Sequence, residues 1–231
     1  METLLASPYL VLNGLGLIIG LLLVDRRLAQ RLPQRQDAAY VLLVFSVVVG
    51  WFGAHVLAWL VGSLVFARAG FAFYGGLLAA LAFLAIAGLK AMRADELSVA
   101  LNTAVVPLLV AHGVGRIGCF LAGCCYGVPI PGTTFRHPTQ IYESAFLFLL
   151  AVALSRRRKQ LPFADSVVYL ASYPTFRFFV EFLRDDGRGQ AFGLSTSQWI
   201  SLALVVGACF LCIRAYGRAN RALQPSATMS M

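Results

Sequence analysis

Charged residues are scarce in this chain of 231 residues: they make up 13% of it, whereas hydrophobic residues make up 59%. A soluble domain usually carries about 25% charged residues, so the composition excludes an ordinary soluble protein. Four segments contain no Asp, Glu, Lys or Arg, and each reaches the roughly 20 residues that a helix needs to cross the hydrocarbon of a bilayer. These segments cover residues 3–24, 38–67, 69–89 and 189–213. The sequence therefore predicts an integral membrane protein.

Three further segments are weaker candidates for membrane spans, at about 97–114, 138–155 and 164–183. The second is followed directly by SRRRKQ, a typical cytoplasmic stop. The first span of the chain lacks a basic start and a clear small-residue cleavage site, so we do not interpret it as a cleavable signal peptide. We expect an all-α integral membrane protein with seven transmembrane helices.

Basic residues are distributed unevenly between the two sides that seven spans define. Thirteen of the 19 Lys and Arg residues follow spans one, three, five and seven. The side richer in basic residues is cytoplasmic, which predicts an external N-terminus and a cytoplasmic C-terminus. Because topology accounts for these residues, the net charge of +9 does not indicate a nucleic-acid partner. The six remaining basic residues fall on the outer side: Arg68, Arg116, Arg136, Arg177, Arg184 and Arg188.

Long linkers, low-complexity segments and convincing repeats are absent from the sequence. This predicts a single polytopic membrane domain over residues 1–218, with a short external insert at about 112–138. We expect residues 219–231 to form a disordered cytoplasmic tail.

The segment YPTFRFFVEFLRDD places four polar residues on one face of a helix, because they are spaced by four, four and three positions. They are Tyr173, Arg177, Glu181 and Arg184. A charge inside a membrane is costly and normally faces a cavity or a partner. One interpretation is an Arg177–Glu181 pair that only joins helices. The other is an anion site, in which the planar guanidinium binds a phosphate and Glu181 orients it.

Residues 112–127 read HGVGRIGCFLAGCCYG, a glycine-rich segment at the outer end of a predicted span. His112 and Arg116 share a helix face, and the glycines that follow, up to Gly127, allow close approach of the backbone. A glycine-rich turn beside an arginine is a plausible phosphate cradle. Together with Arg177 on another helix, Arg116 indicates a site for one lipid head group.

Three cysteines in this segment, Cys119, Cys124 and Cys125, lie on the outer side, which is often oxidising. A disulfide from Cys119 to one of the other two is one interpretation. A reactive thiol whose pKa is lowered by Arg116 is another. Their spacing relative to His112 or His137 matches no standard zinc pattern, and we predict no metal and no cofactor.

Two further segments carry polar groups toward the same side. RHPTQIYES contains His137, Gln140, Tyr142 and Glu143 at the start of a span. These are more polar side chains than an interfacial anchor needs. In FYGGLL, Tyr74 precedes two glycines at the outer start of the third span. It is either an aromatic-belt residue or part of the polar site.

These motifs resemble those of a known family. GRIGCFLAGCCYG resembles the GRxGNFxNGExxG signature of the bacterial prolipoprotein diacylglyceryl transferases, and RHPTQIYES resembles their RHPSQLYEA element. YPTFRFFVEFLRDD resembles their R-x-x-x-E-x-x-R helix, FYGGLL their FHGGLL turn, and LSTSQWIS a GQxLS element that opens their last span. The elements follow family order along nearly the whole chain.

The resemblance implies a reaction at the bacterial cytoplasmic (inner) membrane, with the active site on the outer side. A diacylglyceryl group moves from phosphatidylglycerol, or a related anionic phospholipid, to the thiol of a lipobox cysteine in a prelipoprotein. A thioether forms and glycerol phosphate leaves. By residue matching, Arg116 and Arg177 hold the phosphate and stabilise the leaving group, Glu181 orients Arg177, and Gly127 closes the signature turn. His112, His137, Gln140, Tyr142, Glu143, Tyr173 and Arg184 are the further substrate-binding residues that we expect.

The chain departs from the family pattern at positions expected to take part in catalysis. Tyr74 replaces a histidine, Cys119 an asparagine and Cys124 a glutamate, while Ala122 and Asn13 replace another asparagine and a tyrosine. A thiol with a pKa near 8.5 ionises partly unaided, so a base is dispensable. Two alternatives remain open. The external cysteines could perform thiol redox chemistry or transfer to another acceptor, or the protein could bind phospholipid without catalysis.

Overall fold

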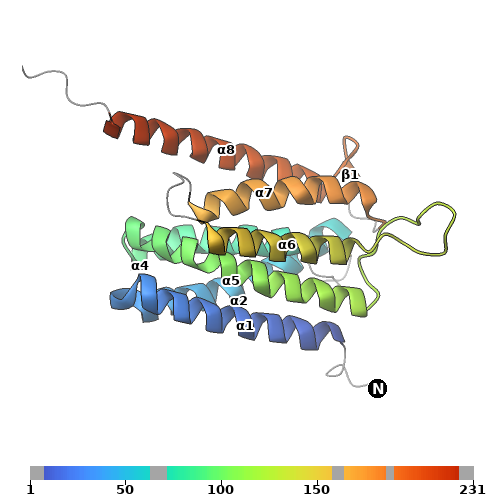
Figure 1. Ribbon diagram of the computed structural model, residues 1–231, viewed down its shortest axis with the longest axis horizontal. Helices are drawn as coiled ribbons and strands as arrows, with labels where there is room; N and C mark the ends of the chain where they lie inside the picture. Colours follow the sequence, from blue (N-terminus) through green and yellow to red (C-terminus); the bar gives the residue numbers. More distant parts are fainter. Residues whose placement is uncertain (1–7, 63–71, 158–163, 186–189, 224–231) are drawn as a thin grey trace, which may run out of the picture.

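The structure is a computed structural model that describes residues 8–62, 72–157, 164–185 and 190–223. It is mostly helical, and its long helices run side by side along one direction (Figure 1). Two of the basic residues predicted on the outer side, Arg68 and Arg188, lie outside the described residues. The elements, in chain order, are α1 (Pro8–Arg31), η2 (Pro33–Arg35), α2 (Gln36–Gly62), α3 (Phe73–Phe83), η4 (Leu84–Gly88), α4 (Leu89–Ala91), α5 (Ala94–Leu121), α6 (Thr139–Arg156), α7 (Asp165–Val180), η5 (Glu181–Leu183), β1 (Gln190–Ala191), β2 (Leu194–Ser195) and α8 (Thr196–Leu223).

Five helices in the described part of the chain are long and apolar enough to cross a membrane. They are Pro8–Arg31, Pro33–Leu60, Phe73–Ala91, Ala94–Leu121 and Thr196–Arg214. Their apolar side chains also cover the outside of the bundle: Val206 is 69% exposed and Ile213 is 71% exposed. A soluble monomer rarely exposes apolar surface on this scale, so these findings support an all-α membrane protein.

Small residues allow the helices to approach one another closely. Gly53 of α2 faces Gly75 of α3, and a Cβ on either glycine would collide with the backbone of the other helix. Gly16 of α1 faces Ala111 of α5, where an added Cβ would lie 2.7 Å from the Ala111 carbonyl oxygen. Association of helices within a membrane depends on such close packing. These contacts fix α1 against α5 and α2 against α3.

Two apolar clusters form the core. One joins α1, α2, η4 and α5 around Leu28 and Leu97. The other joins α3, α5, α6 and α7 around Leu109, Leu147 and Tyr173. The second cluster directly adjoins the polar residues described below, so packed apolar side chains hold those residues in place.

The structure places the segment boundaries differently from the sequence patterns. α5 continues to Leu121, so the first part of the expected insert at 112–138 is helical and the chain leaves the helix at residue 122. α8 extends to Leu223 and includes residues 219–223 of the expected tail, whereas residues 224–231 lie outside the described residues. The connection between α5 and α6 projects from the end of the bundle at which α1 begins (Figure 1).

Candidate active site

Glu143 connects the polar residues of three helices. It lies in the second turn of α6, and its side chain is completely buried. The Tyr173 hydroxyl of α7 donates a hydrogen bond to Oε1 at 2.8 Å, and Nε of Arg116 on α5 lies 2.9 Å from Oε2. A buried carboxylate is stable only when such partners replace its hydration. The structure therefore brings together Arg116, Glu143 and Tyr173, which the sequence placed on three separate segments.

His112 completes this group one helical turn before Arg116. Its Nε2 lies 3.6 Å from Oε1 of Glu143. The Phe73 ring stacks on the imidazole with centroids 4.0 Å apart, and the Tyr173 ring meets it edge-on. The Nδ1 atom is buried and has no hydrogen-bond partner among the described residues. His112 is thus fixed by its neighbours and retains one unused polar atom.

A second buried group surrounds Glu181, at the C-terminal end of α7. Arg177 forms an ion pair with its Oε2, and Nε of Arg184 lies 3.8 Å from the same oxygen. The Ser195 hydroxyl donates to Oε1 at 2.8 Å. Nη2 of Arg177 is buried and makes no hydrogen bond to the described residues. This guanidinium group is enclosed by its neighbours and retains one unused donor.

The two groups lie within electrostatic range of each other, since both Arg177 and Arg184 act on Glu143. Taken together, three arginines face two glutamates, Glu143 and Glu181. A desolvated guanidinium can bind a phosphate through two parallel hydrogen bonds. The anion site that the sequence predicts at these residues stays a prediction.

Tyr74, at the start of α3, lies beside these groups and is buried. Its hydroxyl makes a 2.7 Å hydrogen bond with the Ser201 hydroxyl of α8, and Ser201 donates to the Ser197 carbonyl. Its ring packs edge-on against Tyr173. This contact joins α3 to α8, and a catalytic role for Tyr74 stays a prediction.

The cysteines follow Arg116 on α5 and in the adjoining loop. The Sγ atom of Cys119 lies 4.0 Å from Nη1 of Arg116, and the Cys124 thiol donates to the Cys119 carbonyl at 3.4 Å. None of the three cysteines forms a disulfide in the described structure. Burial raises the pKa of Cys124, so the prediction of a thiol with a lowered pKa is wrong for this residue.

The loop is fixed to the rest of the site by Gly127 and Arg136. The Gly127 amide donates to the His137 carbonyl at 2.8 Å, and a Cβ at position 127 would collide with the Leu183 carbonyl. Nη1 of Arg136 lies 2.6 Å from Oδ2 of Asp185. Gly127 therefore permits the loop to pack against the end of α7.

The residues of RHPTQIYES separate into two environments. Gln140 is buried, and its Nε2 donates to the Cys124 carbonyl, so it anchors the loop. His137 and Tyr142 lie near the surface, where Nδ1 of the imidazole is 3.4 Å from the phenol oxygen, and the Tyr142 side chain is 38% exposed. The structure thus joins Glu143 to the arginines but leaves His137 and Tyr142 outside the buried group.

Sequence reasoning missed three buried serines at the start of α8 and in the strand before it, Ser195, Ser197 and Ser201. Ser195 bonds Glu181, Ser201 bonds Tyr74, and the Ser197 carbonyl accepts from the Ser201 hydroxyl. The available signal was the polar LSTSQ run at the start of an apolar span, in which Gln198 also accepts a hydrogen bond from the Ser195 amide. Two-residue strands and this turn place the run against the end of α7.

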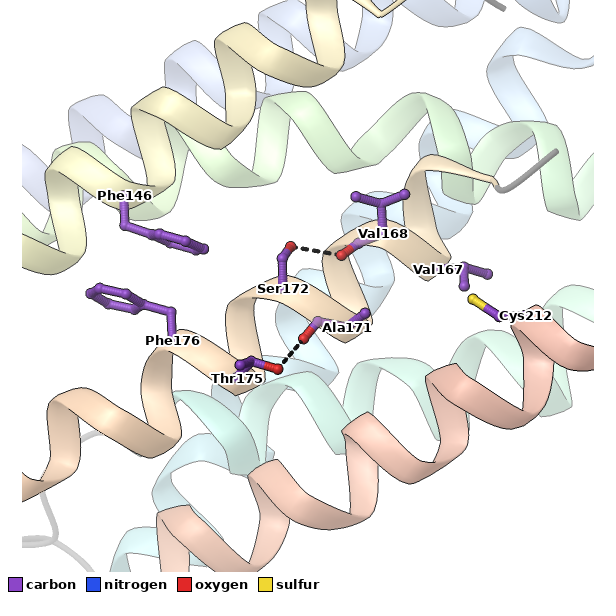
Figure 2. Close-up of a pocket in the computed structure, with 8 residues that line it drawn as sticks. All are labelled: Phe146, Val167, Val168, Ala171, Ser172, Thr175, Phe176 and Cys212. Carbon is purple, nitrogen blue, oxygen red and sulfur yellow. Dashed lines mark hydrogen bonds between the residues drawn. The ribbon is translucent and has the colours of Figure 1, made fainter. Parts of the chain in front are cut away.

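An apolar groove of about 600 Å³ lies between α6, α7 and α8. Phe146 and Phe176 face each other at one end of it, with ring centroids 4.2 Å apart, and Cys212 lies at the other end (Figure 2). The hydroxyls of Ser172 and Thr175 donate to carbonyls of their own helix, so they add little polarity. On α7 the groove face is opposite to the face that carries Arg177.

The fold and the site define a class of protein: a helical membrane protein with a buried arginine–glutamate cluster at one end of its bundle. The family model described as prolipoprotein diacylglyceryl transferase matches residues 6–214. A phosphatidylglycerol–prolipoprotein diacylglyceryl transferase of Clostridium tetani is 33% identical over 229 residues, which cover 88% of this chain and 90% of the relative. A second enzyme of that name from Clostridium perfringens is 34% identical, with 86% of each chain covered. The chain belongs to the prolipoprotein diacylglyceryl transferase family, which confirms the resemblance found in its motifs.

Proposed function

We propose that the protein transfers the diacylglyceryl group of phosphatidylglycerol to the thiol of a prelipoprotein lipobox cysteine. The cysteine sulfur attacks the glyceryl carbon that bears the phosphate oxygen. The carbon–oxygen bond breaks, a thioether forms, and glycerol phosphate leaves with the bonding electrons, while the thiol proton passes to solvent. The observation that carries this proposal is the buried group of three arginines and two glutamates, Arg116, Arg177, Arg184, Glu143 and Glu181, in a chain of this family.

In this proposal the arginines bind the phosphate before the reaction and stabilise the charge that develops on the leaving oxygen. The free Nη2 of Arg177 is aimed at the phosphate, and Arg116 approaches it from α5. Glu181 and Glu143 hold the two guanidinium groups in fixed orientations. No described residue has to act as a base, because a thiol with a pKa near 8.5 is partly ionised at neutral pH.

The apolar groove supports a lipid substrate. An apolar groove open to the hydrocarbon of a bilayer takes lipid chains, because water is absent there. The groove shares α7 with the arginines, and Phe176 at its end immediately precedes Arg177. One acyl chain of phosphatidylglycerol lies in this groove while the head group reaches the arginines around the outer end of α7.

The active site faces the outer side of the membrane in a protein with seven spans, formed by α1, α2, α3 with α4, α5, α6, α7 and α8. α6 has 18 residues, which at 1.5 Å each gives about 27 Å, close to the roughly 30 Å of the hydrocarbon core. α7 continues into η5 and reaches a similar length. The end of α5, the start of α6 and the end of α7 gather at the end of the bundle where α1 begins (Figure 1). The basic residues after α1 and α6 lie at the opposite end, as expected for a cytoplasmic face.

Kinetics of purified variants test the proposal. Arg116→Ala and Arg177→Ala should each reduce transfer to a lipobox peptide by at least a hundredfold, since each removes a group that stabilises the leaving phosphate. Arg93→Ala is the matched control, because this arginine is 78% exposed at the other end of the bundle. Unchanged transfer in both site variants would refute the proposal. Head-group binding by the wild type without any transfer would favour a non-catalytic phospholipid-binding protein.

A further inference from the structure

Three thiols meet at the point where α5 ends. Cys119 lies in the last turn of α5, and Gly123, with a φ of +65°, turns the chain back after the helix. The Cys124 amide then donates to the Cys119 carbonyl at 3.1 Å, and the Cys124 thiol donates to the same oxygen. The turn therefore returns the second and third cysteines to the first.

The thiols lie close together. The side chains of Cys119, Cys124 and Cys125 lie near enough to interact with one another, and the turn returns the Cys124 thiol to 3.4 Å from the Cys119 carbonyl. A disulfide needs Cβ atoms about 3.5–4.5 Å apart and a sulfur–sulfur bond of about 2.05 Å. Thiols gathered at one turn can reach that geometry by a local movement of the loop.

Cys125 has an unusual backbone conformation, with a φ of +63°. Few residues other than glycine adopt it, so surrounding contacts must hold it. The Thr139 hydroxyl donates to the Cys125 carbonyl at 2.9 Å, and Gln140 donates to the Cys124 carbonyl. Both anchors come from the first turn of α6, one turn before Glu143. The first turn of α6 thus presents the Cys125 side chain to Cys119.

The thiols differ in access to solvent. Cys119 is 8% exposed, whereas Cys124 and Cys125 are half-buried. A disulfide-bearing oxidant therefore reaches Cys124 and Cys125 before Cys119, and Cys119 is placed to resolve a mixed disulfide on Cys125. In sum, two protein thiols and one small-molecule disulfide give one protein disulfide and two small-molecule thiols. Two electrons and two protons pass to the oxidant.

The loop that carries these thiols adjoins the arginine cluster at the end of α7. Arg116, Arg177 and Arg184 are each no more than 8% exposed, so a head group can reach them only if neighbouring segments move. The loop contacts the end of α7 through the Gly127–Arg184 bridge. A covalent link between this loop and α5 would restrain that movement.

We propose that Cys119 and Cys125 form a reversible disulfide that fastens the loop beside the arginine cluster and lowers access of the anionic head group. The effect on transfer rests on the proposed function, whereas the disulfide itself does not. The reduced protein is the active form. Oxidation by a small-molecule disulfide closes the site, and a thiol reductant reopens it.

Thiol trapping tests the disulfide independently of activity. The full-length protein in lipid nanodiscs is treated with oxidised glutathione or with dithiothreitol, alkylated, and mapped by peptide mass spectrometry. We expect the peptide containing Cys119, Cys124 and Cys125 to take up one alkyl group after oxidation and three after reduction. Cys124→Ser should still lose two alkylation sites, whereas Cys119→Ser and Cys125→Ser should lose none. Three alkylated thiols after oxidation, or a pair that persists in Cys125→Ser, would overturn the assignment.

Transfer activity separates this inference from the proposed function. Oxidation should lower the rate at least fivefold in the wild type, reductant should restore it, and Cys125→Ser should keep its rate under both conditions. An equal rate in the oxidised and reduced wild type would refute control by the disulfide. If the disulfide forms but no transfer occurs in either state, the proposed function is refuted and the disulfide site is not.

Discussion

At the scale of single residues, Glu143 is central to the stability of the site. It is completely buried, forms an ion pair with Arg116 and accepts a hydrogen bond from the Tyr173 hydroxyl. Removing one partner of a buried ion pair is strongly destabilising, because the other charge is left without compensation. Stability and activity therefore both depend on this carboxylate.

Glu143→Gln should lower the free energy of unfolding by about 3–5 kcal/mol, as expected for breaking a buried pair. At roughly 2–4 °C per kcal/mol for a chain of this size, the melting temperature in detergent should fall by several degrees. Tyr173→Phe is the matched control, since it removes one hydrogen bond worth about 1 kcal/mol. Equal melting temperatures for the two variants would contradict the central position of Glu143.

Gly127 is required for a different reason, which is space. In Gly127→Ala the added Cβ meets the Leu183 carbonyl and the His137 Cβ. Such overpacking costs about 1–3 kcal/mol, and it displaces the loop from the end of α7. Thermal unfolding should show the loss, whereas Gly14→Ala, where nothing lies within 4 Å of the new Cβ, should be at least as stable as the wild type. A fully stable Gly127→Ala would show that the loop does not need this contact.

At the scale of the elements, the apolar runs predicted most helices because a helix in lipid satisfies its own backbone polar groups. Helix ends were less predictable. α5 continues through Arg116 and Cys119 to Leu121 despite its glycines, since packing against α1 and α6 outweighs their low helix propensity. The contacts of Ser195 and Ser201 also escaped the sequence, because they depend on how α8 crosses α3 and α7.

Filling the groove between α6, α7 and α8 should affect lipid binding alone. Ala171→Trp places a large ring among the groove residues, so KM for phosphatidylglycerol should rise several-fold while kcat changes little. Val206→Trp on α8 is the matched control, since that side chain is 69% exposed on the outside of the bundle. If both variants retain the wild-type KM, the acyl chain does not occupy the groove.

At the scale of the whole molecule, the motifs predicted the Arg177–Glu181 pair but not the link between Arg116 and Glu143. Arg116, Arg177 and Glu181 could be assigned by spacing and resemblance. The link through Glu143, by contrast, requires α6 to lie between α5 and α7, which no local pattern specifies. The paired helices place every buried charge of the site at one end of the bundle.

The orientation of that end can be measured in intact cells. A cysteine introduced by Thr133→Cys, in the exposed loop, should react with a membrane-impermeant maleimide. Arg93→Cys, at the exposed start of α5, should react only after the membrane is permeabilised. Peptide mapping identifies the labelled position. The reverse pattern would place the arginine cluster on the cytoplasmic side and contradict the proposed topology.

The most direct measurement of the central claim follows both products of one reaction. The purified protein is reconstituted with phosphatidylglycerol and a lipobox peptide, and mass spectrometry quantifies the peptide adduct and the released glycerol phosphate. The account predicts a diacylglyceryl thioether on the peptide cysteine and an equal amount of glycerol phosphate, both abolished by Arg177→Ala. Absence of the adduct beside an active relative, such as the Clostridium tetani enzyme, would contradict it.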